Sequence, residues 1–138
     1  MEDKNVQDPI MSQPSVILVV DDEANFREIF SAKLGQAGFK VETAESALAG
    51  IEKAKRIKPD LILLDIRMPE VNGVDAMMRI KEDPSIKDIK VVFLTSAGDP
   101  QLQAEGSDEK FAVEIGASGY VRKTDDLDAI VEKIKSYL

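Results

Sequence analysis

The feature that most constrains the fold is a run of four apolar residues, Leu61-Ile62-Leu63-Leu64, that leads directly into Asp65. A short unbroken apolar run between turn signals favours a strand buried on both faces of a parallel sheet, although periodicity alone does not exclude a helical segment. The C-terminal ends of parallel strands border the crevice in which open α/β sheets bind ligands. Asp65 is therefore either a functional carboxylate at such a crevice or a residue that turns the chain after the strand, and this stretch alone leaves both interpretations open.

Strands and helices are expected to alternate five times along the chain. The pattern predicts strands at 16–20, 39–43, 61–64, 89–94 and 119–122, and helices at 26–37, 46–57, 74–81, 108–115 and from residue 124 or 125 onward. Such alternation calls for a parallel sheet with helices on both faces. The predicted fold class is α/β, a doubly wound five-stranded parallel sheet of the flavodoxin-like (βα)5 type, whose common strand order is 2-1-3-4-5.

The 138 residues indicate one domain. Residues 1–14 carry Pro9 and Pro14 among polar residues without periodicity, and we expect them to form a flexible N-terminal tail before a domain at 15–138. No apolar run approaches the roughly 20 residues that span a bilayer, and the N-terminus lacks the basic-then-apolar order of a signal peptide. A cytoplasmic location is the expectation.

Composition removes several classes of chemistry. Cysteine and histidine are both absent, which excludes disulfides, thiolate metal sites, imidazole zinc ligands and a Ser-His-Asp triad. The 18 basic and 26 acidic residues give a net charge of −8. An acidic surface argues against direct binding to nucleic acid or to an anionic membrane.

Polar residues stand at four of the expected strand ends. Asp21 and Asp22 follow the first strand, Asp65 the third, Thr95 the fourth and Lys123 the fifth. Each has a plain structural explanation: Asp22 could cap the following helix, Thr95 could simply end its strand, and Lys123 could pair with the acidic residues after it. In the expected strand order, however, they converge at one crevice, and this conjunction favours a functional site.

The chemistry of this cluster points to phosphoryl transfer. Close carboxylates repel one another unless a cation intervenes, and oxygen ligands suit Mg²⁺ or Mn²⁺. A carboxylate can attack phosphorus to form an aspartyl phosphate. The metal ion, Lys123 and the Thr95 hydroxyl could then each stabilise one phosphoryl oxygen. The cluster therefore supplies each part that an aspartyl phosphate requires.

From residue 15 to residue 138 the sequence resembles a response-regulator receiver domain of two-component signalling. The resemblance rests on Asp21, Asp22, Asp65, Met68-Pro69, Gly73, Thr95 and Lys123. It implies a stand-alone phosphorylation-activated switch in which Asp65 accepts a phosphoryl group from a histidine kinase or a histidine phosphotransfer protein. It also implies an unknown downstream protein partner, and either a monomer or a phosphorylation-dependent homodimer.

The resemblance also assigns metal-binding and tuning roles. It implies that Asp22, Asp65 and the Arg67 carbonyl ligate Mg²⁺, with Asp21 acting mostly through water. In such domains the side chains of Arg67 and Ala97 border the water that hydrolyses the phosphoryl group. Alanine cannot orient water, so we hypothesise a slow self-dephosphorylation, lasting minutes or longer, and no other enzymatic activity.

In such domains activation moves particular residues. Thr95 is expected to move toward the phosphoryl group and Tyr120 to rotate inward behind it, with a change in the face formed by the fourth helix, fifth strand and fifth helix. Two departures from the family pattern bear on this. Thr124 follows Lys123 where the family usually has a proline after a cis peptide, which could aim Lys123 differently. The Gly98–Ser107 loop is longer than expected and could alter partner choice.

Alternatives remain open from the sequence. One is a receiver-like interaction module that is never phosphorylated. Another is a haloacid-dehalogenase-like phosphatase, although its nucleophile ends the first strand in an Asp-x-Asp arrangement and the first strand here is followed by Asp21-Asp22-Glu23. The chain could also be a receiver cut from a larger regulator or hybrid kinase.

Overall fold

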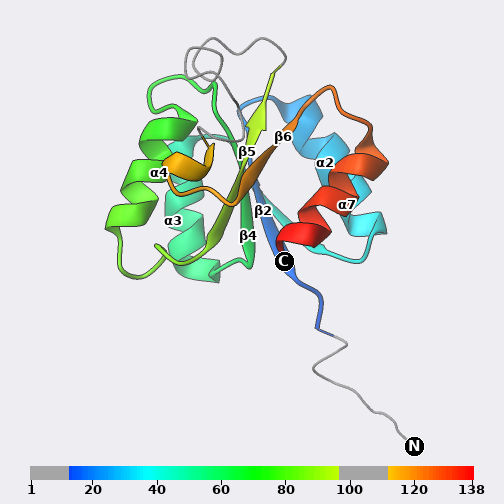
Figure 1. The fold of residues 1–138 in the computed structure, drawn as a ribbon, viewed down its shortest axis with the longest axis horizontal. Coiled ribbons are helices and arrows are strands. Elements are labelled where there is room, and N and C mark those ends of the chain that lie inside the picture. The colour runs from blue at the N-terminus through cyan, green and yellow to red at the C-terminus, as the bar shows by residue number, and fades with distance from the viewer. Residues whose placement is uncertain (1–12, 97–111) are drawn as a thin grey trace, which may run out of the picture.

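The structure, a computed structural model, describes residues 13–96 and 112–138. Its strands form one parallel five-stranded sheet in the spatial order β3-β2-β4-β5-β6, with elements numbered as in Figure 1. The strands are β2 (Val16–Val20), β3 (Lys40–Ala44), β4 (Leu61–Asp65), β5 (Lys90–Thr95) and β6 (Gly119–Arg122). In chain order this is 2-1-3-4-5, so the predicted fold class and topology are confirmed.

Helices cover both faces of this sheet. They are α2 (Ala24–Gln36), α3 (Ala47–Ile57), α4 (Gly73–Glu82) and α7 (Leu127–Tyr137). Figure 1 shows α2 and α7 against one face and α3 and α4 against the other. Residues 112–114 are also helical, as expected for the later part of the 108–115 helix, whereas residues 108–111 and the Gly98–Ser107 loop lie outside the described residues.

Burial on both faces explains the unbroken apolar runs. In β2, Ile17 and Val19 pack with the α2 and α7 side chains, while Leu18 and Val20 pack with those of α3 and α4. All five residues of β4 are buried, and this strand lies between β2 and β5 in the middle of the sheet. A strand with helices on both sides cannot alternate apolar and polar residues, because neither face meets water. The opening apolar run is thus the central strand, and it carries Asp65 at its C-terminal end.

The last helix begins later than the sequence indicated. Expected from residue 124 or 125, α7 begins at Leu127 because Asp126 is its N-cap. The Asp126 carboxylate accepts a hydrogen bond of 3.1 Å from the Ala129 N–H, and a capping residue itself lies outside the helix. The expected Ser46 cap is confirmed, since its hydroxyl accepts from the Ala49 N–H at 3.1 Å. Among the described residues, no helix is long and apolar enough to cross a membrane.

Candidate functional site

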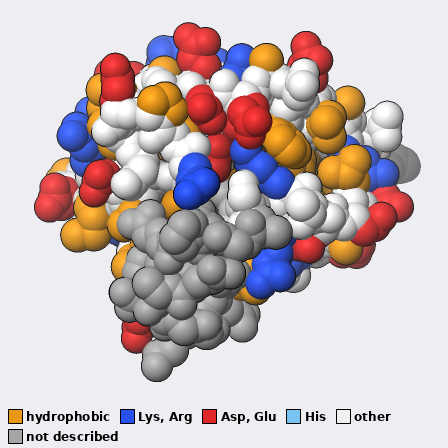
Figure 2. Space-filling view, turned by 90° about the horizontal axis from the view of Figure 1, so that it is seen from above, with side chains coloured by type: hydrophobic (Ala, Val, Ile, Leu, Met, Phe, Trp, Pro, Cys, Tyr) orange, Lys and Arg blue, Asp and Glu red, His pale blue; other side chains and the backbone are white. Residues whose placement is uncertain are grey.

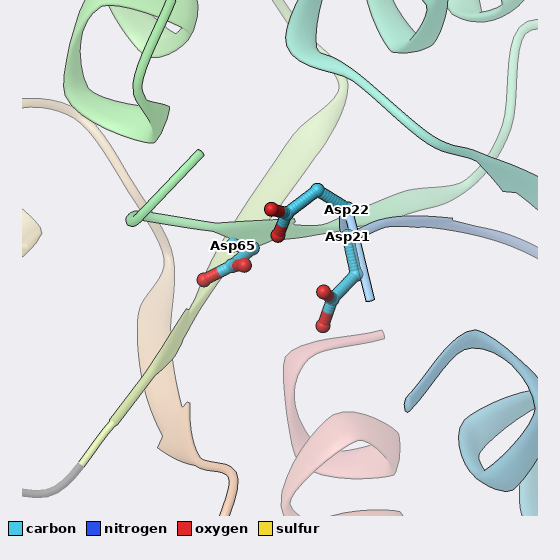
Figure 3. Close-up of side chains that lie close together, drawn as sticks. All are labelled: Asp21, Asp22 and Asp65. Carbon is cyan, nitrogen blue, oxygen red and sulfur yellow. The ribbon is translucent and has the colours of Figure 1, made fainter. Parts of the chain in front are cut away.

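Three carboxylates meet at the C-terminal edge of the sheet. Asp21 and Asp22 follow β2, Asp65 ends β4, and one oxygen of each lies within 4.8 Å of the others. Figure 3 shows the three side chains close together. Asp21 and Asp65 are buried, while Asp22 is exposed. Seen from this edge, acidic side chains group beside basic ones near the middle of the molecule (Figure 2). The structure therefore brings together the three aspartates that the sequence singled out.

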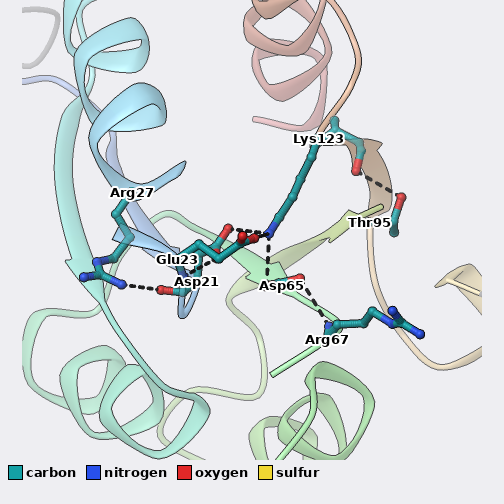
Figure 4. A network of polar contacts seen from close by, with 8 residues as sticks. Asp21, Glu23, Arg27, Asp65, Arg67, Thr95 and Lys123 are labelled. Carbon is teal, nitrogen blue, oxygen red and sulfur yellow. Dashed lines mark hydrogen bonds and ion pairs between the residues drawn. The ribbon is translucent and has the colours of Figure 1, made fainter. Parts of the chain in front are cut away.

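Lys123 reaches into this cluster from the end of β6 (Figure 4). Its Nζ lies 3.0 Å from Asp21 Oδ2, 3.3 Å from Asp65 Oδ2 and 2.8 Å from Glu23 Oε1. Its side chain is only 6% exposed. The plain alternative, a lysine paired with the acidic residues that follow it, is therefore wrong, and the ammonium group is the counter-ion of the buried aspartates.

The backbone around Lys123 is fixed without a cis proline. The described residues contain no cis peptide bond, so the Lys123–Thr124 bond is trans. The Lys123 N–H donates to the Thr95 carbonyl at 2.7 Å, which joins β6 to β5 at their ends. The Asp125 N–H donates to the Arg122 carbonyl at 3.0 Å, and the Asp125 carboxylate accepts from the Arg122 N–H at 3.1 Å. This closed turn directs Lys123 toward the crevice. Thr124, which stands where the family usually has proline, has therefore not changed the direction of the Lys123 side chain.

The loop after β2 is held by its own hydrogen bonds. Asp21 Oδ1 accepts from the Glu23 N–H at 2.9 Å, and the Asp21 carbonyl accepts from the Arg27 guanidinium at 2.8 Å. The N-cap of α2 is Glu23, so the alternative role of Asp22 as helix cap is wrong. Glu23 and Arg27 were not among the predicted site residues. The run of three acidic residues was the signal available for Glu23, but nothing in the sequence pairs it with Lys123.

Burial and charge shift the ionisation of the central groups. Burial raises the pKa of Asp65 to about 7, and the negative charge of Asp21 acts in the same direction. The Lys123 charge and the Arg67 N–H lower this pKa without offsetting the rise. Burial by itself would lower the pKa of Lys123, but the close contacts with Glu23 and Asp21 and the charge of Asp65 together raise it above its usual value. The site therefore holds more negative charge than its single ammonium group compensates.

The donor set fits a divalent cation. Asp21 Oδ2 is buried, and although it lies 3.0 Å from Lys123 Nζ, it has no hydrogen bond of good geometry within the described part of the chain. A buried carboxylate oxygen normally has a hydrogen-bonding partner. The Asp21 carboxylate lies beside those of Asp22 and Asp65, and hard cations such as Mg²⁺ prefer oxygen ligands of this kind. Asp21, Asp22 and Asp65 could therefore hold Mg²⁺.

The two predicted switch residues lie on neighbouring strands, β5 and β6, and differ in burial. Thr95 ends β5 and is buried, with its hydroxyl 3.5 Å from the Val121 carbonyl. A hydrogen bond of that length is weak, so the hydroxyl is easily redirected. Tyr120 is half-buried in β6, and the Lys133 ammonium lies 4.4 Å from the centre of its ring. That contact is a cation–π interaction, which helps to hold the ring in its present position.

Of the two residues expected to border the hydrolytic water, Arg67 lies beside the Asp65 carboxylate. The Arg67 N–H donates to Asp65 Oδ1 at 3.2 Å, and its side chain is exposed. This bond orients the Asp65 carboxylate. Ala97 lies outside the described residues.

Comparison with known proteins agrees with this geometry. The sequence matches the family described as response regulator receiver domain over residues 17–135. The polar-differentiation response regulator DivK of Brucella ovis is 32% identical, with 90% of this chain and 95% of that protein covered. The chemotaxis response regulator CheY4 of Vibrio cholerae superposes with a TM-score of 0.78 at 25% identity, covering 91% of this chain and 100% of that one.

Longer proteins also contain this domain. The DNA-binding dual master transcriptional regulator RpaA of Synechocystis is 31% identical over 88% of this chain, and the phosphate regulon regulatory protein PhoB of Pseudomonas aeruginosa is 34% identical over the same share. The chain spans about half the length of these two relatives, 48% and 51%. With the sequence match and the site geometry in agreement, the chain belongs to the response regulator receiver domain family of two-component signalling.

Proposed function

We propose that this receiver domain is a switch that is turned on when Asp65 accepts a phosphoryl group. The observation that carries the proposal is the placement of the buried Asp65 carboxylate, at the end of the central strand and 3.3 Å from Lys123. The donor is a phosphohistidine on a histidine kinase or a histidine phosphotransfer protein. An Asp65 oxygen forms the new bond to phosphorus, the P–N bond breaks, and the imidazole nitrogen leaves with the electron pair.

Mg²⁺, or Mn²⁺ in its place, is part of this proposal. Asp22, Asp65 and the Arg67 carbonyl would hold it directly, with Asp21 acting mostly through water. The ion would supply positive charge beside the phosphoryl oxygens. Asp65 is positioned by the Arg67 N–H, and Lys123 balances charge on the opposite side of the carboxylate.

The first prediction is uptake of one phosphoryl group by the purified protein. Incubation with acetyl phosphate or phosphoramidate and Mg²⁺ is expected to add one phosphoryl group per chain, measured by intact-protein mass spectrometry. The gain should vanish in Asp65→Ala and when EDTA removes the metal ion. No gain with any donor, including a phosphorylated histidine phosphotransfer protein, would leave the unphosphorylated interaction module as the better account.

The receiver family is a family of signalling domains, so a phosphatase is no longer a competing proposal.

The output of the switch is proposed to be a changed protein-binding face. Thr95 exchanges its weak contact with the Val121 carbonyl for the phosphoryl group, and Tyr120 rotates inward behind it. The face that responds comprises the expected fourth helix, β6 and α7, and it would bind an unknown downstream protein in the cytoplasm rather than nucleic acid or a membrane. Sedimentation before and after phosphorylation distinguishes a monomer from a phosphorylation-dependent homodimer.

The lifetime of the phosphoryl group is the second prediction. The likeness to receiver domains implies that Ala97 borders the hydrolytic water, and alanine cannot orient water. We therefore expect the phosphoryl group to persist for minutes or longer in the presence of Mg²⁺. The decay is followed by mass spectrometry after the donor is removed. Ala97→Glu, which supplies a carboxylate at that position, is expected to shorten the lifetime. Loss of the phosphoryl group from the unaltered protein within seconds would contradict the prediction.

A further inference from the structure

Of the three carboxylates around the Lys123 ammonium group, that of Glu23 lies nearest, although the phosphorylation chemistry does not call for it. Its Oε1 lies 2.8 Å from Lys123 Nζ, compared with 3.0 Å for Asp21 and 3.3 Å for Asp65. The Phe26 ring closes another side of the ammonium group, with its centre 4.4 Å from Nζ. Figure 4 shows the three carboxylates around Lys123. Together with the Phe26 ring they enclose its ammonium group.

The position of Glu23 frees its carboxylate for this contact. Glu23 is the N-cap of α2, where a short side chain such as Ser or Asp usually accepts a hydrogen bond from the first turn. Its own side chain makes no capping bond. Its backbone is fixed, because its N–H donates to Asp21 Oδ1 at 2.9 Å and its carbonyl accepts from the Arg27 N–H at 3.1 Å. Because the backbone of Glu23 is fixed and its carboxylate is not used for capping, the carboxylate can lie against the Lys123 ammonium group.

The ammonium group of a lysine has three N–H donors, and here three carboxylates lie around it. Glu23 and Asp65 each accept a hydrogen bond from it, and Asp21 is a third ion-pair partner. A phosphoryl oxygen on Asp65 would therefore compete with the neighbouring carboxylates for Lys123. The side chains of Asp21 and Asp65 are 0% and 2% exposed, whereas that of Glu23 is 57% exposed. Leaving a buried carboxylate unpaired is far more costly than returning an exposed one to water.

We propose that Glu23 is the exchangeable partner of Lys123: it holds the ammonium group while Asp65 is unmodified, and it competes for that group with an incoming phosphoryl oxygen. Glu23 is thus a positioning residue that restrains phosphorylation by acting through Lys123. The proposal rests on the proposed function, since the incoming oxygen belongs to the phosphoryl group of Asp65. It adds a role for a residue outside the metal-binding and phosphoryl-accepting set.

The test compares Glu23→Gln with the unaltered protein. Gln keeps the size of the side chain and removes its charge, and the rate of phosphorylation by acetyl phosphate with Mg²⁺ is expected to rise about two- to five-fold, the range of a partly exposed ion pair. Glu23→Ala, which also removes the contact, should act in the same direction. Glu28→Gln is the matched control: Glu28 is exposed in the second turn of α2, so its variant changes the net charge equally, and its rate should stay unchanged.

A second measurement separates this proposal from the proposed function. Beryllofluoride with Mg²⁺ imitates a phosphoryl group without any donor chemistry, and its affinity, measured by NMR titration, is expected to rise two- to five-fold in Glu23→Gln. Phosphorylation rates and beryllofluoride affinities that are equal or lower in Glu23→Gln would overturn the role of Glu23, as would an equal gain in Glu28→Gln. Failure of the unaltered protein to accept phosphate counts against the proposed function, and the beryllofluoride comparison then decides on Glu23. If neither the unaltered protein nor Glu23→Gln binds beryllofluoride, both the proposed function and the role of Glu23 are overturned.

Discussion

Asp65→Asn is expected to raise the free energy of unfolding of the metal-free protein by about 2 kcal/mol at pH 8. The Asp65 carboxyl has a pKa raised to about 7 by burial and by the charge of Asp21, so its ionised form is destabilised in the folded protein. A rise from 3.8 to about 7 sets an upper limit of about 4 kcal/mol. Asn removes the ion pair with Lys123 at 3.3 Å as well, and this loss offsets part of the gain.

The gain should depend on pH in a defined direction. Because the folded pKa of Asp65 lies above its unfolded value of 3.8, its contribution to stability is fully present below pH 3.8 and is lost as the pH rises to about 7. Asn does not titrate, so the difference between variant and unaltered protein should be smallest near pH 4 and reach its full size above pH 7. Urea unfolding in EDTA at a series of pH values measures it.

Two comparisons make this result specific to the site. Asp88→Asn removes the same charge from an exposed aspartate before β5 and should leave stability nearly unchanged. Mg²⁺ is expected to stabilise the unaltered protein more than it stabilises the Asp65→Asn variant, because a cation is bound best by the full set of carboxylates. Adding Mg²⁺ should therefore reduce the difference in free energy of unfolding between the two proteins. A variant that is less stable than the unaltered protein at pH 8 in EDTA would show that the Asp65–Lys123 pair outweighs the repulsion.

The sequence was sufficient for the fold and for expecting Asp21, Asp65 and Lys123 at one edge of the sheet. The apolar run before Asp65 is unbroken because β4 is buried on both faces, and the same reasoning applies to β2. Parallel strands point the same way, so the residues after them share one edge whatever the details of the loops. That is why the order of the strands is enough to predict that Asp21, Asp65 and Lys123 lie together.

The sequence was not sufficient for contacts that depend on turn closure or on side-chain conformation. The route of Lys123 into the crevice depends on a turn closed by Asp125, which can be assigned only when the Arg122–Asp125 hydrogen bonds are seen. The role of Glu23 follows from a capping position whose side chain does not cap. The Glu23–Lys123 contact joins residues 100 positions apart, and the Arg122–Asp125 contact closes a single turn. Neither contact leaves a periodic pattern in the sequence.

Gly73→Ala is expected to destabilise the protein by about 3 kcal/mol, a fall in Tm of about 10 °C. Gly73 opens α4, and its N–H donates to the Ile66 carbonyl at 2.8 Å, so the helix start lies directly against the end of β4. A Cβ there would meet the Asp65 carbonyl oxygen and lie 2.7 Å from Ile66 Cα. Both are backbone atoms in the strand end that positions the phosphoryl-accepting carboxylate, so relief of the clash must move Asp65 or α4.

Gly35→Ala is the matched control for this effect. Gly35 lies in α2, and a Cβ added there meets nothing within 4 Å. The same substitution should therefore stabilise the protein by about 0.5 kcal/mol, because Ala loses less conformational freedom than Gly in a helix. Opposite shifts in Tm for the two variants, together with slower phosphorylation in Gly73→Ala alone, would tie the close approach of α4 to the geometry of Asp65. Equal Tm values for Gly73→Ala and the unaltered protein would mean that the strand end gives way freely, and that Asp65 is not held by the packing of α4 against it.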